Sequence, residues 1–342
     1  MIDAMLRAVA EADPDGVAVV HEDRRVGRAE LYRLVAEAAE GLRDRGVAAG
    51  DTVLIALPNC PEFVICYLAT ARIRALVYAV DHAAALPELR RALDDATPRL
   101  VLTGPANCAR IGGLLAQTPG LADTVVVVCG APAAGAVPFA ELPRPISGPV
   151  PAAPDYPGDW SVTYSSGSVG SPKRICRSQA NQVAEARHIA ASAGLGTQDR
   201  ILCVVPLFHA LGQFCCMITA IGSGATLVLL EQGTTTAEDG AREAVMPAQI
   251  GRILELIRLH RVSVVPAVPY FYELMAQLDP RTACDLSSVR LFLSGANFLP
   301  ASIAEAFRQR HGVPVRQTYG SSEAGSVAWD CAPQNLVRHG TV

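Results

Sequence analysis

Short apolar runs alternate along this chain with stretches that have the periodicity of a helix. In residues 28–45, for example, Leu31, Val35 and Leu42 fall on one helical face. Between such stretches, runs rich in valine, isoleucine and leucine predict strands at 52–57, 75–80, 100–103, 124–128, 161–164, 201–205, 225–230, 262–265 and 289–293. Because strands that alternate with helices form parallel sheets covered on both faces, this pattern predicts an α/β fold.

The length and composition are those of a folded protein with a large core. The 342 residues suggest two folding units or one large α/β unit. Hydrophobic residues make up 50% of the chain and charged residues 18%, which excludes wholesale disorder. The 29 basic and 33 acidic residues give a net charge of −4, so the chain lacks the positive field that a nucleic-acid partner requires.

The cysteines and one long uncharged stretch indicate where in the cell the protein resides and whether it spans a membrane. The 10 cysteines include no CxxC pair, and the first residues, MIDAMLRAVAEADPD, lack the basic start and apolar block of an export signal. We therefore expect reduced thiols in a cytoplasmic protein. Residues 201–230 carry no charged side chain, but Pro206, His209 and Gly212 interrupt them. This favours a buried strand, a loop, a short helix and a second strand over a membrane span.

The most polar loop of small residues follows the strand expected at 161–164. It reads SSGSVGSPK, from Ser165 to Lys173, and Lys173 is the only lysine of the chain. Glycines that let backbone N–H groups turn inward, nearby hydroxyls and one mobile ammonium suit a polyphosphate. The loop is neither a Walker A sequence nor a nucleophile elbow, and no GxGxxG follows a strand. The alternative is a flexible Ser/Gly turn on the surface.

Two further segments carry chemistry. PLFHALG, residues 206–212, places a histidine at the end of a buried strand, where open α/β sheets bind ligands. The alternative for an isolated histidine is a core position bonded to backbone. QTYGSSEAG, residues 317–325, offers an aromatic ring, a glycine, hydroxyls and a carboxylate that is a natural Mg²⁺ ligand. Taken alone, this segment could equally be a solvated loop.

Together and in this order, the segments resemble the adenylate-forming superfamily of acyl- and aryl-CoA ligases, adenylation domains and luciferases. TYSSGSVGSPK is similar to the family's phosphate loop, PLFHALG to its substrate-side histidine segment, LFLSGANFLP to its adenine-side strand and loop, and QTYGSSEAG to its Tyr-Gly-x-Thr-Glu motif. RGVAAGDTVLIALPNCPEF matches an early structural segment. The resemblance implies the large N-terminal AMP-binding domain, a layered αβαβα fold of two parallel-type sheets. One subdomain would span about 51–195 with the phosphate loop, and the other about 1–50 plus 196–335 with the acyl pocket.

The resemblance also implies roles for particular residues. The β and γ phosphates of ATP would be held by Ser165, Ser166, Ser168, Lys173 and the backbone of Gly167 and Gly170. The rest of the nucleotide would be bound by Gly295, Ala296, Asn297, Tyr319, Gly320 and Ser322, with Tyr319 stacked on adenine and Ser322 at the α-phosphate. Glu323 would hold Mg²⁺. The acyl pocket would be lined by His209, Gly212, Val265, Val268, Ser294, Gly295, Tyr319 and Ser321, and the catalytic set would be Lys173, His209, Ser322 and Glu323.

The sequence departs from the family at several of these positions. Val169 stands where the family usually has threonine, Arg174 and Arg74 stand at usual glycines, and Ser322 replaces threonine. Only 19 residues follow Glu323 (342 − 323). The family continues there with a ribose-binding aspartate, a hinge and a small domain that carries a catalytic lysine. We therefore expect a fragment of a longer enzyme.

The implied activity is ATP-dependent activation of a carboxylic acid, followed by transfer to a thiol. Amino-acid-activating relatives usually carry an aspartate where this chain has His209, which favours an aryl, fatty or polyketide-like acid. The acceptor would be CoA, with a carrier-protein pantetheine as the alternative. A non-catalytic module that binds nucleotide and acyl group is a third hypothesis. Family members often form homodimers, and the sequence itself indicates no oligomeric state.

Overall fold

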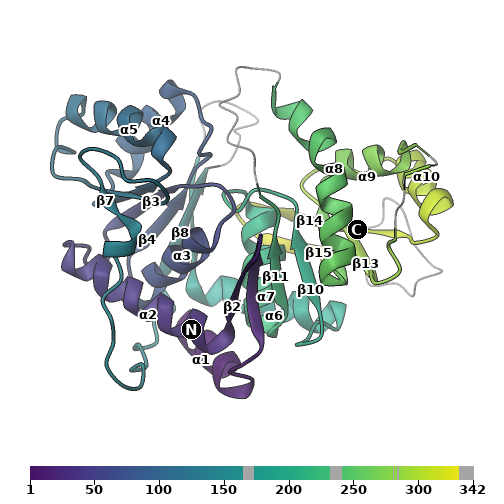
Figure 1. The fold of residues 1–342 in the computed structure, drawn as a ribbon, viewed down its shortest axis with the longest axis horizontal. Helices are drawn as coiled ribbons and strands as arrows, with labels where there is room; N and C mark the ends of the chain where they lie inside the picture. The colour runs from purple at the N-terminus through teal and green to yellow at the C-terminus, as the bar shows by residue number, and fades with distance from the viewer. Residues whose placement is uncertain (165–172, 232–240, 280, 283–284, 331–342) are drawn as a thin grey trace. The chain divides into compact units, whose positions relative to one another are not determined.

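The computed structural model describes residues 1–164, 173–231, 241–279, 281–282 and 285–330. Contacts within the chain divide it into two compact units, Met1–Gly16 with Val26–Val183, and Val17–Arg25 with Ala184–Val342. Figure 1 labels the elements and colours them by residue number. Each unit contains one sheet, and each is described by itself below.

The first unit is built on a seven-stranded sheet in the order β7-β6-β5-β3-β4-β8-β9. Its strands are β3 (Thr52–Ala56), β4 (Leu76–Ala79), β5 (Leu100–Thr103), β6 (Val125–Val128), β7 (Val137–Pro138), β8 (Asp159–Tyr164) and β9 (Arg174–Ser178). Neighbouring strands are parallel except at the edge, where β9 is antiparallel to β8. Its helices are α1 (Ile2–Ala12), α2 (Arg28–Asp44), α3 (Pro61–Ile73), α4 (Leu86–Ala96), α5 (Pro105–Gln117) and the 3₁₀ turn η1 (Phe139–Glu141).

Side chains from alternate strand positions build the core of this unit. Leu54 and Val101 pack with apolar residues of α4 and α5, which cover that face of the sheet. On α3, the ring of Tyr67 lies edge-on to Trp160 of β8, with centroids 5.0 Å apart. The helix α3 also packs against α1 and α2.

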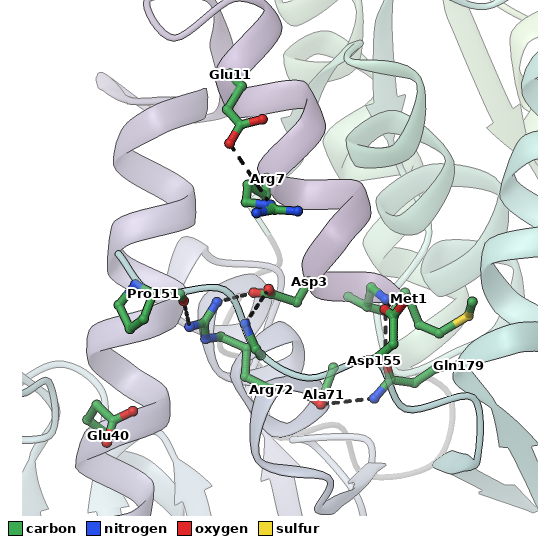
Figure 2. A network of polar contacts seen from close by, with 12 residues as sticks. Met1, Asp3, Arg7, Glu11, Glu40, Ala71, Arg72, Pro151, Asp155 and Gln179 are labelled. Carbon is green, nitrogen blue, oxygen red and sulfur yellow. Dashed lines mark hydrogen bonds and ion pairs between the residues drawn. The ribbon is translucent and has the colours of Figure 1, made fainter. Parts of the chain in front are cut away.

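A buried ion pair fixes α1 to α3, as Figure 2 shows. Arg72 of α3 pairs with Asp3 of α1, and both side chains are buried. Backbone groups complete the network, because Arg72 Nη2 donates to the carbonyl of Pro151 at 2.7 Å and the Ala153 amide donates to Asp3 Oδ2 at 2.9 Å. The irregular connection that precedes β8 is thus held against α1.

The second unit is built on an eight-stranded sheet in the order β15-β14-β13-β12-β10-β11-β1-β2. Its strands are β1 (Val17–His21), β2 (Arg24–Gly27), β10 (Arg200–Cys203), β11 (Thr226–Leu229), β12 (Val264–Ala267), β13 (Leu291–Ser294), β14 (Val315–Ser321) and β15 (Gly325–Trp329). Neighbouring strands from β14 to β1 in this order pair in parallel, and β15 is antiparallel to β14. Its helices are the π-helix η2 (Leu211–Ile218), α7 (Thr219–Ser223), α8 (Ala241–His260), α9 (Pro269–Ala276) and α10 (Ala301–His311), while α6 (Gln179–Ala193) begins in the first unit and continues into the second.

The structure confirms the expected α/β class and places every predicted strand within two residues of its predicted bounds. The sheets are mixed rather than purely parallel, because β9 and β15 run antiparallel at two edges. The division into units differs from the expected one in the first 50 residues. The helices α1 and α2 pack on α3 and so lie in the first unit, and β1 pairs with β11 in the second.

The uncharged stretch 201–230 forms β10, a loop, the helices η2 and α7, and β11, as the sequence predicted. Among the described residues, no helix is long and apolar enough to cross a membrane.

Candidate functional site

The carboxyl ends of β12 and β13 lie level with each other and with the middle of the neighbouring strand β14. Ala267 of β12 is in register with Ser294 of β13, which is in register with Gln317 of β14. Val268 follows β12, Gly295–Asn297 follow β13, and Tyr319–Glu323 form the end of β14 and the turn after it; the sequence assigned all of these residues to a nucleotide and acyl site. The carboxyl edge of an open α/β sheet is where such folds bind ligands.

Gly295 brings three of the sequence segments into contact. Its amide donates to the carbonyl of Ala267 at 3.1 Å. A β-carbon placed on Gly295 would lie 2.8 Å from Thr318 Cγ2 and 3.1 Å from Leu211 Cδ1. Only glycine therefore leaves the close approach of β14 and η2 undisturbed here. The next residue, Ala296, has a left-handed backbone with φ 68°, which turns the loop sharply after the strand.

The PLFHALG segment forms a tight turn that leads into η2. The His209 amide donates to the Pro206 carbonyl at 3.1 Å, and the Gln213 amide donates to the His209 carbonyl at 3.0 Å. A β-carbon on Gly212 would lie only 2.3 Å from the Pro206 carbonyl oxygen, so the backbone needs glycine there. The His209 side chain is exposed, with its ring centroid 4.4 Å from that of Phe208. The helix that follows is a π-helix, a form that occurs frequently at functional sites.

The last segment forms a hairpin between β14 and β15. Ser322, Glu323 and Ala324 make the turn, and the Ala324 amide donates to Ser321 Oγ at 3.1 Å. Gly320 lies at an irregularity in the ladder, where a β-carbon would meet the Gly325 carbonyl oxygen at 2.4 Å. The ring of Tyr319 is 60% exposed, and Glu323 is exposed at the tip of the turn. The hairpin therefore presents an aromatic face and a carboxylate to solvent.

Ser294 and Val265, which the sequence assigned to the acyl pocket, are buried. Ser294 shares a face of β13 with Phe292, whose ring packs edge-on against Tyr272 of α9 and Phe307 of α10. The Ser294 side chain therefore points toward α9 and α10, away from the contact between Gly295 and η2. Its buried hydroxyl has no hydrogen-bond partner among the described residues.

Two polar contacts near the hairpin were not predicted from the sequence. Cys215 Sγ of η2 lies 3.7 Å from Ser326 Oγ of β15. The Ser326 amide donates to Glu185 Oε1 of α6 at 2.6 Å. Glu185 could have been noticed in the sequence because it lies on the buried face of α6, three residues after Gln182 and four before Ile189. An apolar side chain is expected at such a position.

Most of the expected phosphate loop lies outside the described residues, and with it Ser165, Ser166, Gly167, Ser168, Val169 and Gly170. Lys173 is described in the first unit, where it is exposed and directly precedes β9. On the other side of the loop, Tyr164 ends β8 with its ring 5.1 Å from that of Tyr78. Burial raises the pKa of both phenols, so both stay neutral.

The residues present fit Mg²⁺ only as part of a nucleotide complex. Within the described ranges, no three His, Cys, Asp or Glu side chains gather into a metal site. Mg²⁺ in nucleotide sites is commonly bound by one or two carboxylates together with substrate phosphates. The exposed Glu323 carboxylate, next to the Ser322 hydroxyl, is a donor of that kind.

The two sheets and the segments gathered at Gly295 define an α/β protein of the class that binds its ligands at the carboxyl ends of parallel strands. The chain belongs to the family described as AMP-binding enzyme, whose model matches residues 6–342. This confirms the family that the sequence motifs indicated.

Named relatives agree with this assignment. The chain is 28% identical over 300 residues to 4-coumarate–CoA ligase 5 of Oryza sativa subsp. japonica, covering 86% of this chain and 52% of that protein. It is 30% identical over 325 residues to feruloyl-CoA synthase of Amycolatopsis sp, covering 92% and 58%. The chain thus spans little more than half the length of these relatives. A crystal structure of the N-terminal domain of FACL13 from Mycobacterium tuberculosis superposes with a TM-score of 0.78 at 24% identity, covering 94% of this chain and 76% of that one, and so shares its fold.

Proposed function

We propose that this chain is the nucleotide- and acid-binding part of an enzyme that converts a carboxylic acid to an acyl-adenylate and then to its CoA thioester. The observation that carries the proposal is the contact of Gly295 with both η2 and β14. It assembles the histidine segment, the adenine-side loop and the Tyr319–Glu323 hairpin at one sheet edge. Membership of the AMP-binding enzyme family supports the same activity.

The proposed reaction begins with attack of a substrate carboxylate oxygen on the α-phosphorus of ATP. The bond to pyrophosphate breaks, and AMP becomes the leaving group that a carboxylate lacks. A thiol then attacks the acyl carbonyl and releases AMP. Because the chemistry is mainly positioning and neutralisation of charge, the protein's part is to hold the phosphates and the acid in line.

In this proposal each described residue has a defined task. Lys173 binds the phosphate tail as a compact positive charge, together with the hydroxyls and amides of the loop before it. Tyr319 stacks on adenine, and the Ser322 hydroxyl donates to the α-phosphate. His209, exposed at the start of η2, borders the substrate carboxylate. When bound beside Glu323, Mg²⁺ would neutralise charge on the phosphates.

We propose an aromatic acid without an α-amino group as the substrate. By their names, one of these relatives acts on 4-coumarate and the other forms feruloyl-CoA, and both acyl groups are aromatic. The same names favour free CoA over a carrier-protein pantetheine as the acceptor. Comparing thioester formed with CoA and with a phosphopantetheinyl carrier protein separates these two acceptors. A cytoplasmic location is supported by the free thiols of the eight described cysteines.

Two measurements test the proposed function. Titration calorimetry with acyl-sulfamoyl-adenosines, stable mimics of acyl-adenylates, reports binding to this 342-residue chain. ATP–pyrophosphate exchange with a panel of aromatic acids reports the first half-reaction. We expect binding and exchange with at least one aromatic acid, and a loss of about tenfold or more in ATP affinity for Lys173→Ala. Arg174→Ala is the matched control. Failure of every analogue to bind, or unchanged affinity in Lys173→Ala, would contradict the proposal.

A further inference from the structure

Two aromatic rings are exposed at the carboxyl edge of the second unit. Phe298 is 68% exposed and Tyr319 is 60% exposed, the two highest values among the large hydrophobic side chains of the described residues. A ring left in water forgoes the free energy of burial, so two such rings at one edge indicate a surface that contacts a ligand or partner. Tyr319 has a place under adenine in the proposed function, whereas Phe298 has no role there.

Both rings belong to the same face of the sheet. Phe292 of β13 is in register with Val315 of β14, and the ring of Phe292 packs against α10. Because side chains alternate along a strand, Tyr319, four residues after Val315, lies on this α10 face as well. The loop that carries Phe298 leaves β13 and leads directly into α10, so it crosses the edge on that face too.

The backbone on both sides of Phe298 is held in place although the ring itself is exposed. Ala296 turns the chain sharply at φ 68°, and the Phe298 amide donates to Asn297 Oδ1 at 2.8 Å. The next side chain, Leu299, is fully buried. Because the backbone is already ordered, a ligand that contacts the ring pays little further conformational entropy.

Resting on the proposed function, we infer that Phe298 is a second aromatic contact for the nucleotide base, so that adenine stacked on Tyr319 also meets the ring of Phe298. Every base presents a flat π face, and stacking on exposed aromatic side chains binds it without a deep pocket. Phe298 therefore contributes to the affinity for the base and not to the choice of acid.

The test uses AMP and its fluorescent analogue 2-aminopurine riboside 5′-monophosphate, and so does not depend on the identity of the acid. Titration calorimetry measures the affinity for AMP, and stacking quenches the fluorescence of 2-aminopurine. We expect Phe298→Ala to weaken AMP binding about tenfold, as loss of a stacked ring does, and to relieve part of the quenching. Phe298→Trp keeps a flat ring and should stay within about threefold of wild type. Phe298→Leu keeps an apolar side chain without a π face and should behave as the alanine variant does.

Leu259→Ala is the matched control, because Leu259 is a 55% exposed apolar side chain of the same unit that lies near the end of α8, before β12 begins. This variant should bind AMP as wild type does. Wild-type affinity in Phe298→Ala overturns the inference, as does equal binding by the leucine and tryptophan variants, since an apolar cover would then suffice. If the alanine variant fails to fold, the comparison of leucine with tryptophan decides. These results leave the proposed function standing, whereas failure of the wild-type chain to bind AMP contradicts the proposed function itself.

Discussion

Replacing Gly212 by alanine tests whether the turn before η2 depends on a missing side chain. The added β-carbon would lie 2.3 Å from the Pro206 carbonyl oxygen and 3.2 Å from Leu207 Cα. Ordinary contact begins near 3.4 Å, so the backbone must open by roughly 1.1 Å (3.4 − 2.3). Both atoms belong to backbone, and no side chain can rotate away to make room.

The expected cost follows from these distances. Forcing extra volume into a packed site costs about 1–3 kcal/mol, from which the better helix propensity of alanine subtracts about 0.5–1 kcal/mol. For a unit of this size, we expect the thermal midpoint to fall by about 2–8 °C. Because the His209 amide is bonded to Pro206, the shift should also displace His209 and weaken binding of an acyl-sulfamoyl-adenosine.

The assay is differential scanning calorimetry together with titration of the same analogue. Gly251→Ala is the matched control, since Gly251 is exposed in α8 and a β-carbon there would meet nothing within 4 Å. That variant should gain about 0.5–1 kcal/mol from helix propensity alone. If Gly212→Ala is as stable as Gly251→Ala and binds the analogue normally, the inference that the close approach of Pro206 requires glycine at 212 is refuted.

Three other substitutions probe the site and the frame around it. In Gly295→Ala, the added β-carbon meets only the ends of two side chains, so the thermal midpoint should change by less than in Gly212→Ala. Binding of the acyl-sulfamoyl-adenosine should weaken about tenfold or more. Intact binding would contradict the assignment of Gly295 to the nucleotide and acyl site. Arg72→Met leaves the buried Asp3 carboxylate without its cation (Figure 2) and should lower the free energy of unfolding in urea by about 3–5 kcal/mol. A loss below about 1 kcal/mol would contradict a stabilising role for this ion pair. Burial opposes ionisation of Asp199, but hydrogen bonds from Arg290 and others outweigh it and hold the pKa of this carboxyl below its usual value. Its stabilisation is thus present at neutral pH and lost as the pH falls below about 4, so the difference in thermal midpoint between wild type and Asp199→Asn should shrink there.

Most parallel strands were predictable because they are largely buried and read as continuous apolar runs. Val125–Val128 and Thr226–Leu229 are examples. The sequence did not indicate β1 (Val17–His21), an inner strand parallel to β11, or several strands at sheet edges. Arg174–Ser178 and Gly325–Trp329 have mixed sequences, RICRS and GSVAW, because each is only partly buried and pairs antiparallel with one neighbour. Such short, half-exposed strands carry too little periodicity to stand out.

The candidate site was predictable as segments but not as contacts. The motifs located PLFHALG, SGAN and QTYGSSE, and the structure shows them meeting at Gly295. The orientation of Ser294 depends on strand alternation and on where Phe292 packs, which no motif encodes. The backbone conformation of Arg74 is another feature that the motifs could not predict. It occupies a usual glycine position of the family and adopts φ 61°, a left-handed conformation, with its guanidinium 5.7 Å from the centre of the Tyr156 ring.

Lys173 has a practical consequence for anyone handling this protein. Its exposed side chain carries the only ε-amine in these 342 residues, so amine-directed reagents have two targets in them, Lys173 and the α-amine. Attaching the molecule to a sensor surface through amines would tether it at the group proposed to bind phosphate and would mask that group from the analyte. Used deliberately, the same chemistry labels a single lysine, and the mass increment of the peptide that contains it reports whether nucleotide shields Lys173.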